Sequence, residues 1–429
     1  MKARNTLLMN NKKIIFAFAS FVLGAIVFLL LHPLSGYVSG LRLIWRHPGA
    51  LISDFITVGG LFPTLLNIYL TTWAAILLLF LLKVKWNGIV FAGLFTIAGF
   101  AFFGKTPFNI VPIWLGILTY SRLQHVPTLK LLGAYMFGTG LGPVVSYTWF
   151  AIPLSLWATI PLGLLVGVIA GYLIGPIATT ILPVHKGYNL YHVGFTIGFI
   201  SMLFATLFRA LGLDLNVGTA ITYEHHWFLF WLVMAVSILC LVYPLFNIKE
   251  SLTGFKKTIR EEGKLLSDFI EMHGLKGTLT NVGLLGLMML VVVLVLRFEL
   301  NGPMVGGIFT VMGFGAFGKH VTNVLPVMFG SYLATFLPNI NLYDIGPSIV
   351  IFFVTALAPI TIRYGVIAGV IAGFIHMVIA PTALYFQGGF DLYNNGFTAG
   401  FTAALIVIFV DYIKRPKIKD IQKPNHDLT

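Results

Sequence analysis

Long apolar runs, separated by short polar or glycine-containing segments, extend along the chain to about residue 412. Ten of them are long enough for a helix that crosses a bilayer, which needs ~20 predominantly apolar residues. They lie at 14–32, 61–82, 131–150, 160–182, 189–211, 226–246, 278–296, 345–362, 364–385 and 393–412. We therefore predict an all-α integral membrane protein with about ten transmembrane helices.

Each half of the chain also contains a pair of shorter apolar runs. One pair, 88–104 and 107–121, meets at Gly104-Lys105, and the other, 302–317 and 321–336, meets at Gly318-Lys319. Runs of 15 to 17 residues are short for a full crossing. We expect each pair to form a re-entrant hairpin; the alternative is that both runs span and that each lysine lies in a surface loop.

The two halves of the sequence repeat each other. Residues 40–116 align without a gap on 254–330, with 28 of 77 pairs identical, and residues 163–199 align on 365–401, with 18 of 37 identical. The matches include Asp, Lys, Asn, Arg and Pro, so shared apolar composition does not explain them. The chain is predicted to be a tandem duplication of two membrane repeats, 1–213 and 214–429.

An odd number of spans in each repeat requires the two repeats to be inverted relative to each other, as in many transporters. Of the 27 Lys and Arg residues, 21 fall in segments on one side if the N-terminus is cytoplasmic. Only Arg42, Arg46, Arg209 and Arg297 fall on the other side, as the positive-inside rule predicts. Both termini, an amphipathic loop at 247–277 and a tail at 413–429 are thus expected in the cytoplasm, with the protein in the plasma membrane.

The composition of the chain excludes several classes of function. The chain is 58% hydrophobic and 10% charged, with a mean hydropathy of +0.93, which excludes a soluble enzyme. The net charge of +13 does not indicate nucleic acid, because the basic residues lie between apolar runs. Cys240 is the single cysteine, so an internal disulfide and a cysteine-based zinc site are excluded. No phosphate-binding loop or hydrolase motif occurs, and we expect no enzyme activity, metal or cofactor.

Lys105 and Lys319 are the strongest candidates for function, because they hold equivalent positions inside apolar stretches. Each is followed at the same intervals by an Asn and a Pro: Asn109 and Pro112 after Lys105, and Asn323 and Pro326 after Lys319. An unpaired lysine inside the membrane is costly in free energy. A break between half-helices would place a cation and helix ends near the repeat interface, where transporters bind solutes. The same segments supply further candidates for the path: Asn109, Asn323, Thr96 and Thr310.

Two further sets of matched residues have alternative interpretations. Asp54 and Asp268, in identical Ser-Asp-Phe triplets before a span, either cap a helix or partner a buried lysine or a coupling ion. In the second block the hydroxyls of four residues either face the path or accompany close helix packing at paired glycines. These residues are Tyr191, Thr196, Tyr393 and Thr398.

The paired NGxxxxGxFTxxGFxxFGK segments and the repeated LYxxGFTxGF resemble an uncharacterised bacterial membrane family, domain of unknown function 1576. This resemblance covers most of the chain and implies no activity. The segment His32-Pro33-Leu34-Ser35-Gly36 is also similar to one in urea transporters, which have two inverted five-helix repeats. That likeness is a fold-level analogy, and the second repeat lacks the segment.

The combined interpretation is a transporter or channel in the lipid bilayer for a small polar solute, with the path between the two repeats. An anionic solute is favoured if the lysines face the path. The alternatives are a neutral-solute channel of the urea-transporter type, a lipid-acting membrane enzyme, or a scaffold. The sequence leaves open whether the protein forms a homo-oligomer.

Overall fold

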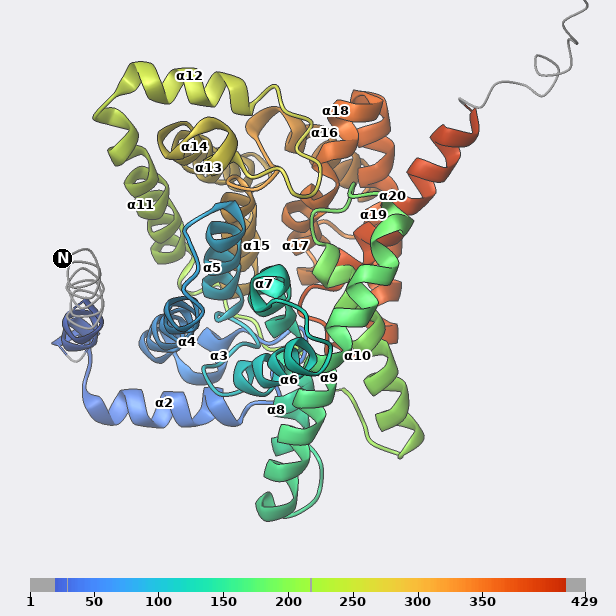
Figure 1. The fold of residues 1–429 in the computed structure, drawn as a ribbon. Coiled ribbons are helices and arrows are strands. Elements are labelled where there is room, and N and C mark those ends of the chain that lie inside the picture. The colour runs from blue at the N-terminus through green and yellow to red at the C-terminus, as the bar shows by residue number, and fades with distance from the viewer. Residues whose placement is uncertain (1–19, 29, 217, 414–429) are drawn as a thin grey trace, which may run out of the picture.

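A computed structural model describes residues 20–28, 30–216 and 218–413, and these residues form helices and connecting segments without a β-strand (Figure 1). Within the predicted first helix, 14–32, residues 20–28 and 30–31 are helical, and residues 14–19 and 29 lie outside the described residues. The predicted tail, 413–429, lies outside them after residue 413. The all-helical architecture expected from the apolar runs is confirmed.

The first repeat contains, in chain order, eleven elements between residues 34 and 210. They are α2 (Leu34–Arg46), α3 (Phe55–Gly59), α4 (Leu61–Leu81), α5 (Gly88–Phe100), α6 (Ile110–Leu123), the 3-10 turn η1 (Thr128–Leu131), α7 (Leu132–Phe137), the 3-10 turn η2 (Gly138–Leu141), α8 (Gly142–Phe150), α9 (Leu156–His185) and α10 (His192–Ala210). The second repeat follows the same order after α11. Its elements are α11 (His226–Leu245), α12 (Ile248–Thr258), α13 (Phe269–His273), α14 (Leu275–Val295), α15 (Gly302–Phe314), α16 (Val321–Ala334), α17 (Ile345–Phe353), η3 (Val354–Leu357), α18 (Ala358–Tyr364), α19 (Val366–Gln387) and α20 (Asn394–Ile413).

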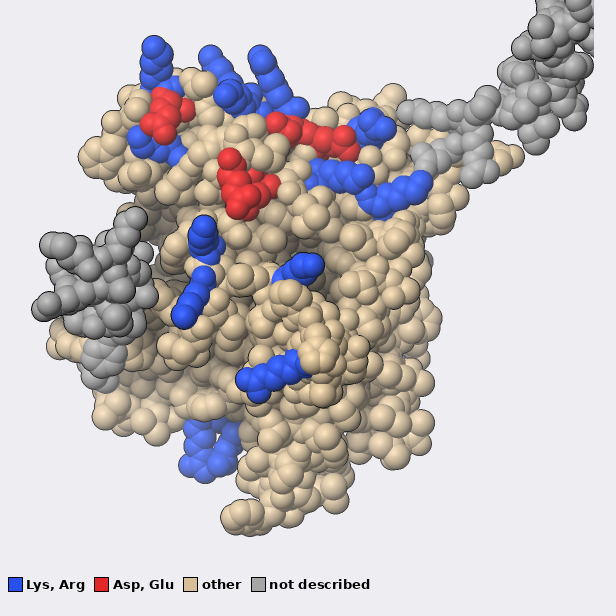
Figure 2. Space-filling model, in the orientation of Figure 1, with Lys and Arg blue, Asp and Glu red and all other residues tan. Residues whose placement is uncertain are grey.

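Equivalent elements of the two repeats lie at opposite ends of the molecule. Figure 1 shows α2 along one end and its counterpart α12 along the other. In Figure 2, the Asp and Glu side chains and many of the Lys and Arg side chains gather over the end that carries α12, and further Lys and Arg side chains are scattered over the middle of this face and its opposite end.

Seven helices are long and apolar enough to cross a membrane, counted over the described residues. They are Leu61–Leu81, Leu156–His185, His192–Ala210, His226–Leu245, Leu275–Val295, Ile345–Tyr364 and Val366–Gln387. This set of apolar helices makes the chain a multi-pass membrane protein. The predicted span at 393–412 corresponds to α20.

One predicted span is interrupted. The run 131–150, expected as one helix, is divided into α7 and α8 by the 3-10 turn η2 at Gly138–Leu141, and its counterpart, although long enough to cross, contains η3 at the matching place. Apolar periodicity does not report such a break, because all four residues of η2 and of η3 are buried like those of a continuous helix.

Two pairs of equivalent helices cross at the interface between the repeats, and both crossings use glycine. A Cβ built on Gly99 of α5 would lie 2.9 Å from the Cα of Gly306 of α15. A Cβ on Gly194 of α10 would lie 3.1 Å from the Cα of Gly396 of α20. Small residues let helix backbones approach closely in a membrane, where lipid tails remove the hydrophobic drive for association. These contacts hold the repeats together.

The α5–α15 crossing gives a stability prediction. We expect Gly99→Ala to lower the free energy of unfolding by about 1–3 kcal/mol, because the added methyl group meets backbone atoms of α15 that cannot move aside easily. The control is Gly346→Ala, where no atom lies within 4 Å of the added carbon. Unfolding of detergent-purified protein, followed by tryptophan fluorescence, measures both. Equal stability of the two variants would contradict the close crossing.

Candidate functional site

A tight turn between two short helices positions each buried lysine. Gly104 and Gly318 have φ values of +102° and +105°, in the left-handed region that favours glycine. The side-chain amide of Asn67, in α4, donates to the carbonyl oxygens of Ala101 and Lys105, at 2.9 Å each. Asn281, in α14, makes the equivalent bonds to Gly315 and Lys319, at 2.8 Å each. The backbone around each lysine is therefore held by an amide from the preceding long helix.

The predicted residues Asn109 and Asn323 complete these turns. Asn109 Nδ2 donates to the Gly104 carbonyl at 2.8 Å, and Asn323 Nδ2 donates to the Gly318 carbonyl at 3.0 Å. Both asparagines are buried, and both also accept a backbone N–H from the start of their own turn. They fix the lysine turns, and neither lines the central cavity described below.

The two lysine side chains are fully buried, and each reaches across to the other repeat. Lys105 Nζ donates to Thr139 Oγ1 at 2.7 Å and to the hydroxyl of Tyr393 in the second repeat. Lys319 Nζ donates to Thr355 Oγ1 at 2.7 Å and to the hydroxyl of Tyr191 in the first repeat. The sequence prediction named the lysines and tyrosines separately; the structure brings them together as two reciprocal pairs.

Aromatic rings and hydroxyl groups, rather than carboxylates, surround the two ammonium groups. The Nζ of Lys105 lies 4.7 Å from the ring centroid of Tyr393, and that of Lys319 lies 4.3 Å from the ring centroid of Tyr191. A cation near a ring is attracted by the electron density of its face. Among the described residues, neither lysine has a carboxylate oxygen within 4.0 Å. Within the described residues, no direct ion pair therefore stabilises a charged form of either lysine.

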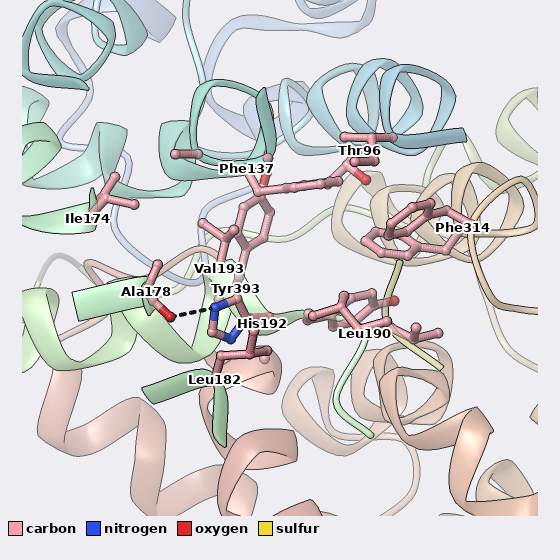
Figure 3. A pocket seen from close by; sticks show the side chains of 18 of the residues that line it. Thr96, Phe137, Ile174, Ala178, Leu182, Leu190, His192, Val193, Phe314 and Tyr393 are labelled. Atoms are coloured by element: carbon pink, nitrogen blue, oxygen red, sulfur yellow. Dashed lines mark hydrogen bonds between the residues drawn. The ribbon is translucent and has the colours of Figure 1, made fainter. Parts of the chain in front are cut away.

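A cavity of about 260 Å³ lies between the repeats beside the lysine–tyrosine pairs. Figure 3 shows side chains of both repeats converging on it, including Thr96 and Phe137 from the first and Phe314 and Tyr393 from the second. Tyr191 and Thr310 also line it. The lysines do not line it, but each is hydrogen-bonded to the hydroxyl of a tyrosine that does.

The cavity has a mouth beside Lys130 and Leu266. The exposed side chains of Lys130 and Leu266 form part of its lining there. Lys130 lies in η1, just before α7, and Leu266 lies in the segment after α12. The cavity thus leads from this mouth toward Tyr191 and Tyr393.

The aspartates of the Ser-Asp-Phe triplets cap helices and join the repeats. Asp54 accepts from the N–H groups of Ile56, at 2.9 Å, and Gly302, at 2.9 Å, the latter being the first residue of α15. Asp268 accepts in the same way from Ile270 and from Gly88 of α5. Burial raises the pKa of the Asp54 carboxyl to about 6, against the lowering effect of the two N–H groups. The structure places neither aspartate on a lysine.

The four predicted threonines bond to their own helices. Thr96 and Thr310 donate to Ala92 and Gly306, and Thr196 and Thr398 donate to His192 and Asn394, four residues earlier in each case. Thr96 and Thr310 line the cavity, whereas Thr196 and Thr398 are buried elsewhere. The structure therefore brings together six predicted residues around the cavity: Lys105, Lys319, Tyr191, Tyr393, Thr96 and Thr310.

Four residues of the site were not predicted. Asn67 and Asn281 lie at equivalent positions inside apolar helices, and this coincidence of two polar residues in the aligned repeats is a signal that identifies them. Thr139 and Thr355 lie between the two aligned blocks, so the repeat alignment does not pair them. They occupy the matching 3-10 turns η2 and η3, which only the folded structure reveals.

The sequence of the chain matches a known protein family. The family described as protein of unknown function (DUF1576) matches residues 35–210 and 247–412, one region in each repeat. The chain belongs to this family, as the paired motifs predicted. No curated protein and no solved structure matches the chain. The likeness to urea transporters therefore has no support from these comparisons.

The two capping aspartates give a matched prediction. We expect Asp54→Ala to lower the free energy of unfolding by about 2–3 kcal/mol, because it leaves two buried N–H groups without an acceptor. Asp268→Ala should cost only about 1 kcal/mol, since this partly exposed site admits water in place of the carboxylate. Thermal unfolding of the two purified variants compares them. An Asp54→Ala protein as stable as the wild type would contradict the capping role.

Proposed function

We propose that this member of the DUF1576 family is a membrane transporter that carries a small polar solute between its two inverted repeats. One observation carries the proposal: the central cavity is lined by equivalent residues of both repeats, yet its exposed lining residues belong to η1, α9 and the segment after α12, and none belongs to α17–α19. Polar residues repeated in both halves of a membrane protein are costly and commonly mark a solute pathway.

The asymmetry of the cavity supports a transporter rather than an open channel. Ala178 of α9 lines the cavity and is partly exposed, whereas its equivalent in α19, Ala380, is only 3% exposed. On the α19 side, His376 Nε2 and Asn395 Oδ1 lie 3.0 Å apart and join α19 to α20. The equivalent residues of the first repeat, Ile174 and Val193, have apolar side chains that cannot form this bond.

Two repeats of similar sequence can adopt each other's conformation at small cost. Such an exchange would close the α9–α10 side and open the α19–α20 side, so that the cavity opens to the opposite face of the membrane. This is alternating access, the mechanism of many transporters built from inverted repeats. The solute site beside Tyr191 and Tyr393 would stay near the centre in both states.

The short helices fit this scheme as re-entrant hairpins. α5 and α6 have 13 and 14 residues, so each is about 20 Å long, less than the ~30 Å hydrocarbon core. The non-helical turns at Lys105 and Lys319 are buried by protein, the condition under which irregular backbone is tolerated at membrane depth. Each hairpin would enter from one face, reach its lysine near the middle, and return.

Cysteine accessibility tests the proposed mechanism. In a Cys240→Ser background, we expect Ala178→Cys to react rapidly with a membrane-impermeant maleimide from the side of the cavity mouth, and Ala380→Cys to react slowly. Solutes that drive transport should slow the first reaction and speed the second from the opposite side. The two alanines are equivalent, so each variant controls for the other. Simultaneous reactivity from both sides would indicate an open channel, and rates that no solute changes would contradict transport.

Orientation in the plasma membrane is a second prediction, based on the distribution of Lys and Arg. We expect the C-terminus and the cavity mouth at Lys130 to face the cytoplasm. A fluorescent protein fused to the C-terminus should therefore fluoresce in cells, and alkaline phosphatase fused there should be inactive. An active phosphatase fusion would reverse the orientation and place the mouth outside.

A further inference from the structure

We propose that Asp391 is a proton-binding site at the interface between the two repeats, and that its proton is the ion coupled to transport. Asp391 lies in the turn between α19 and α20, and the equivalent residue of the first repeat, between α9 and α10, is Asn189. The proton site follows from the described contacts alone, whereas its coupling to a solute rests on the proposed transport function.

Asn189 links its own turn to the second repeat. Its Oδ1 accepts from the backbone N–H of Tyr191 at 2.9 Å, and its Nδ2 donates to the carbonyl oxygen of Gly396 in α20 at 2.8 Å. The side chain is fully buried, so these contacts take the place of hydrogen bonds to water. One side-chain group at this position must therefore accept a hydrogen bond, and the other must donate one.

Asp391 repeats the first contact, but an ionised carboxylate cannot repeat the second. Asp391 Oδ1 accepts from the backbone N–H of Tyr393 at 2.7 Å. The α10–α20 crossing is nearly symmetric: a Cβ on Gly194 would lie 3.1 Å from the Cα of Gly396, and a Cβ on Gly396 would lie 2.9 Å from the Cα of Gly194. The partner that this symmetry gives Asp391 Oδ2 is the carbonyl oxygen of Gly194, which can only accept. A proton on Oδ2 makes it a donor and restores the contact that Asn189 makes.

The surroundings of Asp391 favour the protonated form. The side chain is fully buried, and among the described residues no Lys, Arg or His nitrogen lies within 4.0 Å of its oxygens. Oδ2 makes no hydrogen bond of ordinary geometry with these residues. Burial raises the pKa of the Asp391 carboxyl well above its usual range, and this effect exceeds the lowering by the Tyr393 N–H and by the Gln387 side chain. The described conformation therefore holds Asp391 in its uncharged, proton-bound form.

The other titratable groups around this turn have hydrogen-bond partners of their own. The turn packs against η2, α8, α10 and the segments near residues 51 and 215. The groups on these elements and on the adjoining α19 and lysine turn are His47, Tyr147, Arg209, Asp214, His376 and the Lys105–Tyr393 pair. None of them forms an ion pair with Asp391 within the described part of the chain.

The available oxygens fit a proton better than a metal cation. Hard cations such as Mg²⁺ and Ca²⁺ take about six or more oxygen ligands. Among the described residues of this turn, the buried side-chain oxygens without a hydrogen bond are Asp391 Oδ2 and Gln387 Oε1. A proton needs one oxygen to carry it and one to accept its hydrogen bond, and Asp391 and Gly194 supply these two.

The site adjoins the cavity, which explains how proton binding is coupled to transport. Tyr393, whose N–H binds Asp391, lines the cavity, and so do Gly194 and Gly396. In the proposed exchange of conformations, the α19–α20 side opens and water reaches this wall. The O–H bond of Asp391 then breaks, its electron pair stays on the carboxylate, and water accepts the proton. Asn189 does not titrate, so one exchange is coupled to one proton.

The pH dependence of unfolding tests the proton site on the full-length protein in mixed micelles. The folded protein keeps the proton at pH values where the unfolded chain, with an ordinary carboxyl pKa of about 4, has released it. Rising pH should therefore destabilise the wild type relative to Asp391→Asn, which keeps a donor at every pH. The ratio of their unfolding equilibrium constants should rise about tenfold per pH unit between about pH 5 and pH 7. Asp214→Asn, which changes an exposed aspartate beside the same turn, is the matched control and should behave as the wild type does.

A reciprocal variant and an infrared spectrum provide independent tests. Asn189→Asp places a carboxyl opposite the Gly396 carbonyl and should add a second pH dependence of the same sign. The infrared band of protonated carboxyl groups should lose one contribution in Asp391→Asn and gain one in Asn189→Asp. If Asp391→Asn fails to fold, the results for Asn189→Asp decide.

Cysteine labelling tests the coupling. In the Cys240→Ser background, we measure the ratio of the maleimide labelling rate of Ala178→Cys to that of Ala380→Cys. This ratio should fall as pH rises, because release of the proton favours the open α19–α20 side. A ratio cancels the effect of pH on the labelling reaction itself. Addition of Asp391→Asn should make the ratio independent of pH.

The outcomes separate the proton site, the coupling and the proposed function. The same pH dependence of unfolding in the wild type and in Asp391→Asn would overturn the proton site. Stability that follows the concentration of Na⁺ or K⁺ instead of pH would assign a metal cation in place of the proton. The expected unfolding result, with a labelling ratio that pH does not change, would overturn the coupling. The proposed transport would survive each of these results, because solute-dependent exchange of reactivity between Ala178→Cys and Ala380→Cys tests it separately.

Discussion

The burial of two lysine side chains in an apolar helical protein is the constraint on which the rest of this structure depends. Each ammonium group needs hydrogen-bond acceptors and a favourable electrostatic environment, because water is excluded. The first repeat supplies a tyrosine to the lysine of the second, and the second supplies one to the first. The solvation of each lysine is therefore complete only when the two repeats are packed together.

The elements around the lysines are arranged to satisfy this constraint. The glycine turns at Gly104 and Gly318 present the side chains, and the amides of Asn67 and Asn281 hold the turn carbonyls. The aspartate caps act across the interface, since each carboxylate binds the first N–H of a short helix in the other repeat. Close crossings at glycine bring the backbones near enough for these bonds to form. The same contacts thus hold the repeats together and build the cavity.

Because the chain is a duplication, the two lysine sites are nearly symmetric. The two repeats nevertheless differ in conformation around the cavity. Ala178 of α9 lines the cavity and is partly exposed, whereas the equivalent Ala380 of α19 is buried, and the His376–Asn395 contact joins α19 to α20. A polar contact between two helices is easier to exchange with another partner than a shape-matched apolar surface. The site at the tyrosines lies where the two repeats meet, so the proposed alternating access would leave it available in either conformation.

The sequence by itself determined the helical membrane architecture, the duplication, the two short-helix pairs and the paired lysines. These follow from local apolar content and from residue matches between the repeats, which do not require knowledge of packing. The tertiary structure decided which groups meet: Lys105 and Tyr393 are 288 residues apart, and Lys319 and Tyr191 are 128 residues apart. It also decided the 3-10 turns that carry Thr139 and Thr355, and the side on which the cavity opens. Two nearly equivalent sequences carry the same local preferences, so only the packing of one repeat against the other distinguishes the open side from the closed one.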